Sequence, residues 1–276
     1  MANEFDIGLL CDVIGLGRSS FYYSRQTSDD QGLRKAIESV CLHHSRYGYR
    51  RVTPMLHRGQ YRVNHKRVLR LMKEMGLSVK PRRRKVLTTQ SKTHEPPFPN
   101  LLKGLKIERP DQVWCADITY IFLANGSMLY LALVLDIFTR MIRGWALSRN
   151  LSCALTQEAL SKAFERGHRP EIHHSDRGSQ YTAAGYRKVL WEVGAEISMA
   201  SKGKAWENPF VESTIGHLKD EEVWQQEYVD FEDAFVHLSH FLHVVYNDQR
   251  IHSALGYLTP GEFEAQYKAQ NCKKLA

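Results

Sequence analysis

Long apolar runs are missing from this sequence of 276 residues. No stretch approaches the roughly 20 consecutive apolar residues that a transmembrane helix needs. The first residues, MANEFDIGLLCDVIG, lack the basic start and the apolar body of a signal peptide. We therefore predict no membrane partner and expect a cytoplasmic protein. Since 43% of the residues are hydrophobic, the chain can still fill the core of one large domain or two smaller ones.

Cysteine is scarce as well. The five cysteines, at positions 11, 41, 115, 153 and 272, are widely spaced, and no two form a CxxC pair. This spacing argues against a zinc or redox centre and predicts reduced thiols. Histidines are more frequent, but His237, His240 and His243 drift around a helix, and His173 and His174 would point to opposite faces of a strand. We therefore expect no histidine metal site.

Acidic residues are nearly absent from one region. Between Arg50 and Lys85, thirteen Lys or Arg residues stand against one acid, Glu74, which gives a local charge of 13 − 1 = +12. The whole chain carries +8, so the remainder carries 8 − 12 = −4. A basic module joined to a mildly acidic body predicts an anionic partner such as a nucleic acid.

One helix in the basic region is clear from its periodicity. In VNHKRVLRLMKEMGL (residues 63–77), apolar residues recur at helical spacing, with Asn64 able to cap the start and Gly76 able to end the helix. The cationic residues of the other face are Lys66, Arg67, Arg70 and Lys73. A solvated face is the alternative, but the shortage of acids favours contact with phosphates.

The flanking segments are less distinct. LLCDVIGLGRSSFYYSRQ has a helix-turn-helix rhythm with a second helix from Ser19, although a generic helical pair fits equally well. KPRRRKVLTTQSKTHEPPFPN (residues 80–100) has three prolines and no periodicity, which indicates an extended linker. Its residues Arg82, Arg83 and Arg84 suit a nucleic-acid backbone.

After the linker the pattern predicts an α/β fold. DQVWCADITYIFL and MLYLALVLDIFT form a hairpin around ANGS, and MIRGWALS is a third strand. Helix, strand (EIHHS), helix, strand (EISMA) and helix follow, and a last helix runs from Phe231 to about Tyr246. This order predicts a mixed five-stranded sheet flanked by helices, preceded by a small all-helical basic module.

Three carboxylates stand out in this fold. Asp117 lies inside an apolar strand on the same face as Cys115, where an acid needs a partner or a cation. Asp176 follows EIHHS at a strand end, where α/β sheets commonly place ligand sites. Glu212 lies on the helix after the last strand. Three acids in one place repel one another unless hard cations such as Mg²⁺ are present, and paired ions of this kind support phosphoryl displacement without a covalent nucleophile.

Each acid also has an ordinary structural interpretation. Asp117 is a possible buried hydrogen-bonding residue, Asp176 a possible turn or cap beside Arg177, and Glu212 a possible amphipathic-helix acid. Asp136, with Arg140 as its expected partner, and Glu207 are rival carboxylates. Pattern alone leaves these alternatives open.

Six segments in chain order resemble the OrfB-type transposases of bacterial insertion sequences (insertion-sequence family three), whose core is similar to that of retroviral integrases in the DDE superfamily. The segments are RYGYRRVTPML, VNHKRVLRLMKEMGL, QVWCADITYI, HHSDRGSQYT, SKGKAWENPFVESTIGHLK and YNDQRIHSALGYLTP. Thirty-five residues separate Asp176 from Glu212 (212 − 176 = 36), as the family pattern requires, which favours Glu212 over Glu207. One departure is WENP, where relatives more often carry Asp at Glu207 and Ala at Pro209.

The resemblance implies a ribonuclease-H-like core that binds two Mg²⁺ ions, with Mn²⁺ as a substitute, on Asp117, Asp176 and Glu212. It implies DNA transposition: water cuts the element ends, and the freed 3′-hydroxyls attack target DNA. Expected DNA contacts, besides the cationic residues named above, are Arg50, Arg51, Lys219 and Arg250, and expected supporting residues are His174, Arg177, Asn208 and His252. The alternative interpretation of Lys219 is an ordinary solvated lysine. The alternative for Arg250 and His252 is that they only hold the last helix to the core.

The resemblance also implies partners. These are double-stranded DNA, as terminal inverted repeats and target, an upstream-frame OrfA protein or a fusion to it, and further copies of this chain on DNA in a bacterial nucleoid. No leucine heptad is visible, as expected if the coiled coil comes from the upstream frame. The predicted parts are a helical DNA-binding region (1–80), a linker (81–106), the catalytic domain with its C-terminal helix (107–269) and a tail (270–276). The alternatives are a catalytically silent DNA-binding remnant and a ribonuclease-H-like nuclease.

Overall fold

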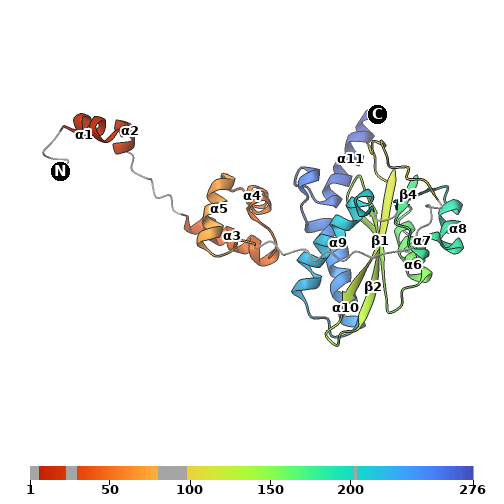
Figure 1. Ribbon diagram of the computed structural model, residues 1–276. Coiled ribbons are helices and arrows are strands. Elements are labelled where there is room, and N and C mark those ends of the chain that lie inside the picture. The colour runs from red at the N-terminus through yellow and green to blue at the C-terminus, as the bar shows by residue number, and fades with distance from the viewer. Residues whose placement is uncertain (1–5, 23–29, 80–97, 202–203, 276) are drawn as a thin grey trace.

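The computed structural model describes residues 6–22, 30–79, 98–201 and 204–275 (Figure 1). The predicted contacts Arg82, Arg83 and Arg84 lie outside the described residues. No helix in the described ranges is long and apolar enough to cross a bilayer.

A mixed five-stranded sheet forms the centre of the larger part, with the strand order β3-β2-β1-β4-β5. The strands are β1 (Val113–Phe122), β2 (Met128–Asp136), β3 (Ile142–Ser148), β4 (Ile172–Ser175) and β5 (Glu196–Met199). The first three pair as an antiparallel meander, while β4 and β5 run parallel to β1. The predicted five-stranded mixed sheet is confirmed.

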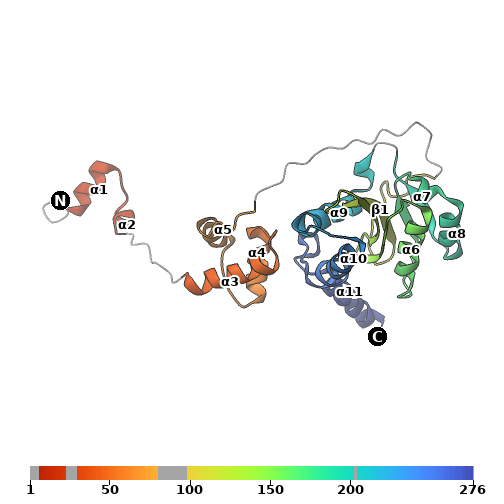
Figure 2. The ribbon, with the colours of Figure 1, turned by 90° about the horizontal axis from the view of Figure 1, so that it is seen from below.

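Helices cover both faces of this sheet (Figures 1 and 2). Because successive residues of a strand point to opposite faces, Trp114 and Ala116 pack toward α6 (Cys153–Phe164) and α8 (Ala184–Glu192). Val113 and Cys115 pack into the other core cluster with α9 (Pro209–Glu221) and α10 (Phe231–His240). The short helix α7 (Ser179–Thr182) lies between β4 and α8.

The end of the chain differs from the expectation. The predicted last helix is α10, which continues as a π-helical segment, Phe241–Gln249. A further helix, α11 (Pro260–Leu275), then continues past residue 269, into the segment that we had expected to be a tail. Short 3-10 turns occupy Ala205–Glu207, Val223–Gln225 and Ser253–Leu255.

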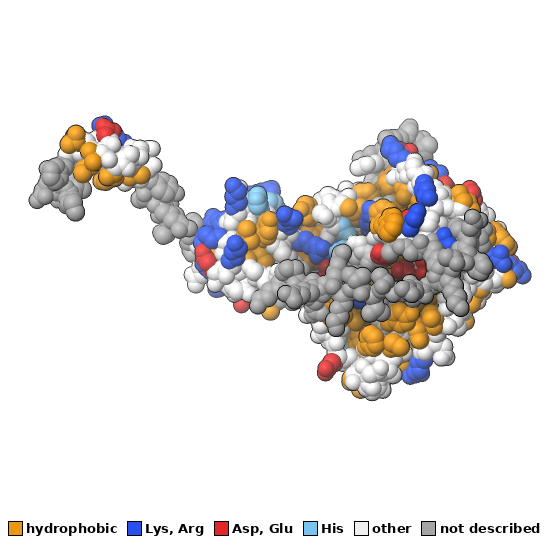
Figure 3. Space-filling view, viewed as in Figure 1, with side chains coloured by type: hydrophobic (Ala, Val, Ile, Leu, Met, Phe, Trp, Pro, Cys, Tyr) orange, Lys and Arg blue, Asp and Glu red, His pale blue; other side chains and the backbone are white. Residues whose placement is uncertain are grey.

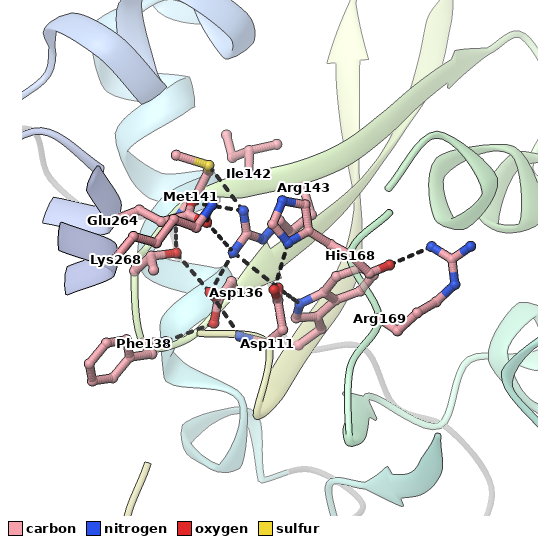
Figure 4. Close-up of polar contacts among 12 residues, drawn as sticks. Asp111, Asp136, Phe138, Met141, Ile142, Arg143, His168, Arg169, Glu264 and Lys268 are labelled. Carbon is pink, nitrogen blue, oxygen red and sulfur yellow. Dashed lines mark hydrogen bonds and ion pairs between the residues drawn. The ribbon is translucent and has the colours of Figure 1, made fainter. Parts of the chain in front are cut away.

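A buried ionic network fixes α11 to the sheet (Figure 4). The Arg143 guanidinium, on β3, lies within 3.1 Å of carboxylate oxygens of Asp111, Asp136 and Glu264. Asp136 is fully buried and also accepts a hydrogen bond from Thr139. The partner of Asp136 is therefore Arg143, whereas we had predicted Arg140. Both its burial and its contacts make Asp136 a structural acid.

The described residues of the N-terminal region form five helices: α1 (Ile7–Ile14), α2 (Arg18–Phe21), α3 (Gln31–His43), α4 (Tyr49–Arg58) and α5 (His65–Glu74). In both ribbon views α1 and α2 stand apart from the other three (Figures 1 and 2). Buried side chains such as Ile37, Val52 and Leu71 join α3, α4 and α5. We call this three-helix unit (residues 30–79) the helical module.

The periodicity-based prediction for α5 is confirmed. The Asn64 side chain caps the helix by accepting a hydrogen bond from the Lys66 backbone N–H at 2.9 Å. Gly76 follows the helix with φ +70°, a backbone conformation that suits glycine at a helix end.

Candidate active site

The first two acids lie where the parallel pairing of β1 with β4 ends, in the middle of β1 and just after β4. The pairing of β1 with β4 ends with Ala116 opposite Ser175. Asp117 and Asp176 are the next residues on the two strands, so they occupy neighbouring positions at one edge of the paired region. The carboxyl end of β4 is also where ligands commonly bind to such sheets.

The third acid is brought to the same place by the start of α9. Asn208, the N-cap residue, is 4% exposed and donates a hydrogen bond from Nδ2 to the Ala116 carbonyl oxygen at 3.2 Å. Val211 packs into the core, and Glu212, in the first helical turn, extends to the surface. All three predicted acids are therefore anchored around Ala116.

The two aspartates retain unoccupied oxygen atoms. Asp117 Oδ1 accepts a hydrogen bond from the Ile118 N–H at 2.8 Å, and Asp176 Oδ1 accepts one from Gly178 at 2.8 Å. No side chain in the described ranges donates to either carboxylate. Oxygen atoms are thus available to a cation.

Burial and mutual repulsion act on the charge of Asp117. Burial, then the neighbouring Asp176 charge and more weakly Glu212, raise its pKa to about 7, although Lys219 and the Ile118 N–H act in the opposite direction. Burial also raises the pKa of Asp176 and of Glu212. Burial lowers the pKa of Lys219, which the Asp117 charge partly opposes. Lys219 therefore lies within electrostatic reach of Asp117.

These donors fit a hard divalent cation. The three candidate ligands are carboxylates, and burial raises the pKa of the adjacent Cys115 thiol so strongly that no thiolate competes with them. Asn208 Oδ1 is buried without a hydrogen-bond partner in the described part of the chain, beside the strand that carries Asp117. No three His, Cys, Asp or Glu side chains in that part are gathered tightly enough to enclose an ion by themselves.

Family models and known proteins match most of this chain. Two family models described as Integrase core domain match residues 107–205 and 193–260, and one described as HTH-like domain matches residues 28–85. The chain is 35% identical over 246 residues to the transposase for insertion sequence element IS904 of Lactococcus lactis, covering 87% of this chain and 96% of that protein. It is 33% identical over 273 residues to the transposase InsF for insertion sequence IS3A of Escherichia coli, covering 95% and 94%. The chain belongs to the IS3-family transposases.

A solved structure shares the fold of this transposase. A chain of the simian T-cell lymphotropic virus intasome, in complex with the PP2A regulatory subunit B56 gamma, aligns with a TM-score of 0.50 at 14% identity. The alignment covers 83% of this chain and 74% of that chain. The catalytic part therefore has the ribonuclease-H-like integrase core that the sequence indicated.

Two predicted supporting residues lie around β4 of the transposase. His174 is buried, its Nδ1 lies 2.8 Å from Ser198 Oγ on β5, and burial lowers its pKa to about 4. The Arg177 Nε donates to the Ala200 carbonyl oxygen at 3.0 Å. His174 thus joins β4 to β5, and Arg177 joins the loop that carries Asp176 to the residue that follows β5. His173 points the other way, to Tyr186 on α8.

Glu207 and Pro209, which depart from the family pattern, have structural explanations. Glu207 Oε2 accepts hydrogen bonds from the Ser201 N–H at 2.6 Å and from Asn100 Nδ2 at 3.0 Å. The hydrogen bond from Ser201 is the main cause that lowers the pKa of Glu207, to about 2. Pro209 is the first residue of α9, where its fixed φ is favourable. Glu207 thus holds a loop in place, which sequence alone did not reveal.

The cationic face of α5 is partly neutralised. Arg67 and Arg70 pair with Asp30, and Arg70 also pairs with Glu74 at 2.6 Å. The remaining cations of this face are Lys66 and Lys73, which are exposed and pair with no acid in the described residues. Figure 3 shows Lys and Arg side chains spread over the helical module. The sequence analysis missed that Asp30, which lies before the predicted basic region, neutralises part of this cationic face.

Two predicted DNA contacts instead form part of an internal ion-pair cluster. Arg250 is 1% exposed and binds both oxygens of Glu221, at 2.8 and 2.9 Å. Arg51, from α4, pairs with the same Glu221 at 2.8 Å, and Arg46 pairs with the neighbouring Asp220 at 2.8 Å. We call these five residues the latch. The burial of Arg250 does not agree with contact between its side chain and a phosphate. The partial burial of Arg51 limits the contact that its side chain can make with a phosphate.

The latch joins the helical module to the last turn of α9, the helix that carries Glu212. Ile251 strengthens this junction because its side chain packs in the core of the helical module and its N–H donates to the Tyr47 hydroxyl at 3.1 Å. His252 is also buried there, and burial, followed by the Arg250 charge, lowers its pKa to about 2. The buried contacts of Arg250 and His252 are structural, in line with the alternative in which they hold the last helix to the core.

The raised pKa of Asp117 predicts a pH effect on stability. A carboxyl that binds its proton more tightly when folded stabilises the protein below its folded pKa, and this contribution is lost as the pH rises toward 7. In metal-free buffer, Asp117→Asn should therefore raise the melting temperature by an amount that grows between pH 5 and pH 7. The difference between variant and wild type is the informative quantity, because His173 and His174, whose pKa values burial lowers, act in the opposite direction. A difference that is constant with pH would contradict the assignment.

Proposed function

We propose that this transposase uses Asp117, Asp176 and Glu212 to bind two Mg²⁺ ions, or Mn²⁺ in their place, and that it cleaves the ends of its element and transfers them into target DNA. The observation that supports the proposal is the placement of the three acids around Ala116. Asp117 follows Ala116 within β1, Asp176 follows the end of β4, and Glu212 lies in the first turn of α9, whose cap residue Asn208 bonds to Ala116. When bound, a pair of such ions activates the attacking oxygen and stabilises the leaving oxygen of a phosphodiester.

The chain's own residues have distinct tasks in this proposal. Asp117 and Asp176 present oxygen atoms from the rigid sheet, and Glu212 presents its carboxylate from the surface of α9. Lys219, on the same helix, sits within electrostatic reach of Asp117 and is our candidate for contact with the phosphate beside the cut. Asn208 joins the start of α9 to β1, and His174 joins β4 to β5, so both residues stabilise the elements that carry the acids.

The helical module is proposed to bind the duplex DNA of the terminal inverted repeats. Lys66 and Lys73 are the exposed cations of α5, and Arg67 and Arg70 can exchange Asp30 for phosphate. Arg50, which is exposed on α4, is proposed to contact the phosphate of a DNA strand outside this duplex. Arg82, Arg83 and Arg84 are proposed to follow the DNA backbone. Target DNA would lie across the catalytic part, near Lys219.

Partners and boundaries complete the proposal. We infer an upstream-frame OrfA protein or fusion and a homo-oligomer on DNA, in the bacterial nucleoid. The division into residues 1–80, 81–106 and 107–269 remains our prediction.

The decisive experiment is product analysis with an element-end duplex and a target plasmid. The purified chain, with its upstream-frame partner supplied, should nick the end and join the freed 3′-hydroxyl to the plasmid in Mg²⁺ but not in EDTA. Cutting without joining would identify a nuclease, and tight salt-sensitive binding without cutting would identify a silent remnant. Either result would refute the proposal.

A further inference from the structure

A groove separates the helical module from the loop that follows the latch. It encloses about 720 Å³, between α4 and α5 on one side and residues 256–258 on the other. This volume falls within the range of roughly 300–1,000 Å³ that is typical of small-ligand sites. The catalytic acids do not line it, so the groove is separate from the site described above.

The charge of the groove is positive. Its lining includes Arg50, Arg58, His57 and His65, and none of its lining residues is an acid. Arg58 pairs with Glu262 at 2.7 Å and is therefore compensated. Arg50 is exposed, and its only polar contact in the described structure is with the Tyr49 hydroxyl, at 3.2 Å from Nε. An anion in the groove would thus find an unpaired guanidinium.

The walls of the groove are aromatic. The Tyr49 ring stacks with the His65 ring, with centroids 6.2 Å apart, and the Arg50 guanidinium carbon lies 5.7 Å from the centre of the Tyr49 ring. Tyr257 forms part of the opposite wall. Aromatic faces next to an unpaired guanidinium are the elements that proteins use to stack a base and hold its phosphate.

The backbone of Tyr257 provides a further observation. Its φ is +63°, in the left-handed region that residues other than glycine rarely adopt, and it follows Gly256, with φ +65°. Arg58 fixes this conformation by donating to the Tyr257 carbonyl oxygen at 2.8 Å. Strained residues of this kind occur preferentially at functional sites, and here the strain places a ring on the groove.

We propose that this groove binds an unpaired nucleotide of a DNA strand, with its base against Tyr49 and Tyr257 and its phosphate beside Arg50. The inference rests on the proposed function, because it takes DNA as the ligand. Bases inside a duplex are already stacked and would leave the aromatic walls unused, whereas a frayed or displaced strand offers a free base and a phosphate together.

The test uses the full chain and two fluorescent probes, a 12-nucleotide single strand and the corresponding duplex, in titrations at one salt concentration. Tyr257→Asn removes the ring but retains a residue that tolerates the left-handed conformation. Arg50→Gln removes the charge at an exposed position where misfolding is not expected. Each variant should lower the ratio of single-strand to duplex affinity, and Tyr257→Asn should lower it about tenfold, the loss expected for one stacked base. Arg62→Gln, which removes an exposed charge of the helical module outside the groove, should leave the ratio unchanged.

An unchanged ratio in both groove variants would overturn the inference. So would equal losses on the single strand and the duplex, because they would show that the groove contacts only the duplex backbone. The outcome is independent of the cleavage assay: a chain that shows the predicted ratios but never nicks DNA would refute the proposed function and leave the groove assignment intact.

Discussion

Asp117→Asn is expected to reduce end cleavage and strand transfer by about 10³-fold or more, while the protein stays folded and still binds DNA. The substitution keeps the size of the side chain and removes the charge, so the hydrogen bond from Ile118 is retained and only the affinity for a cation is lost. Asp176→Asn and Glu212→Gln should have similar effects. Because the three acids act as a unit, the double variant Asp117→Asn/Asp176→Asn should be no worse than either single one.

The matched control is Glu196→Gln. Glu196 is an exposed acid at the start of β5, the end of the strand away from the triad, and its substitution should leave both reactions unchanged. Rates are measured on the same labelled element-end duplex in saturating Mg²⁺. Wild-type rates for Asp117→Asn, or multiplicative losses in the double variant, would show that the acids do not share one task.

Glu221→Gln in the latch is expected to destabilise the protein by about 3–5 kcal/mol, the effect of leaving a buried charge without its partner. Arg250 is 1% exposed, and both oxygens of Glu221 are its partners. Burial alone would raise the pKa of Glu221, but Arg250 and Arg51 hold it below its usual value, so the acid is charged at neutral pH. The free energy of unfolding is measured by urea titration.

A comparison within the same chain separates burial from charge. Glu262 pairs with Arg58 on the surface, where both side chains are more than a third exposed, and Glu262→Gln should change stability by about 1 kcal/mol or less. Equal losses at Glu221 and Glu262 would contradict the account of the latch. Since the latch joins the helical module to α9, Glu221→Gln should also lower cleavage at temperatures where the protein is still folded.

Local patterns were enough to predict most of the fold. Period-two alternation placed Asp117 on the Cys115 face of β1, and the cap and the apolar stripe defined α5, because both signals depend on neighbours within a few residues. For the candidate triad, pattern alone left several carboxylates open, and the resemblance to the transposase family, with the spacing between Asp176 and Glu212 that it requires, favoured Asp117, Asp176 and Glu212. The structure places these acids around Ala116.

The contacts that sequence did not predict join distant segments. Arg250 was expected to contact DNA because its partner Glu221, on α9, is 29 residues away in the sequence. Asp136 was paired with Arg140, whereas the fold of the chain places Arg143, on the neighbouring strand β3, against it. Arg140 instead has φ +62° in a turn, and its guanidinium carbon stacks 4.1 Å from the centre of the Phe210 ring. Such pairings depend on tertiary packing, which charge patterns do not encode.

The most direct test of the central claim, that Asp117, Asp176 and Glu212 together bind the divalent ions, is an anomalous difference map from crystals grown with Mn²⁺. We predict density between the Asp117 and Asp176 carboxylates and within reach of Glu212, and its loss in Asp176→Asn crystals. Mn²⁺ density elsewhere, with none between these carboxylates, would contradict the account.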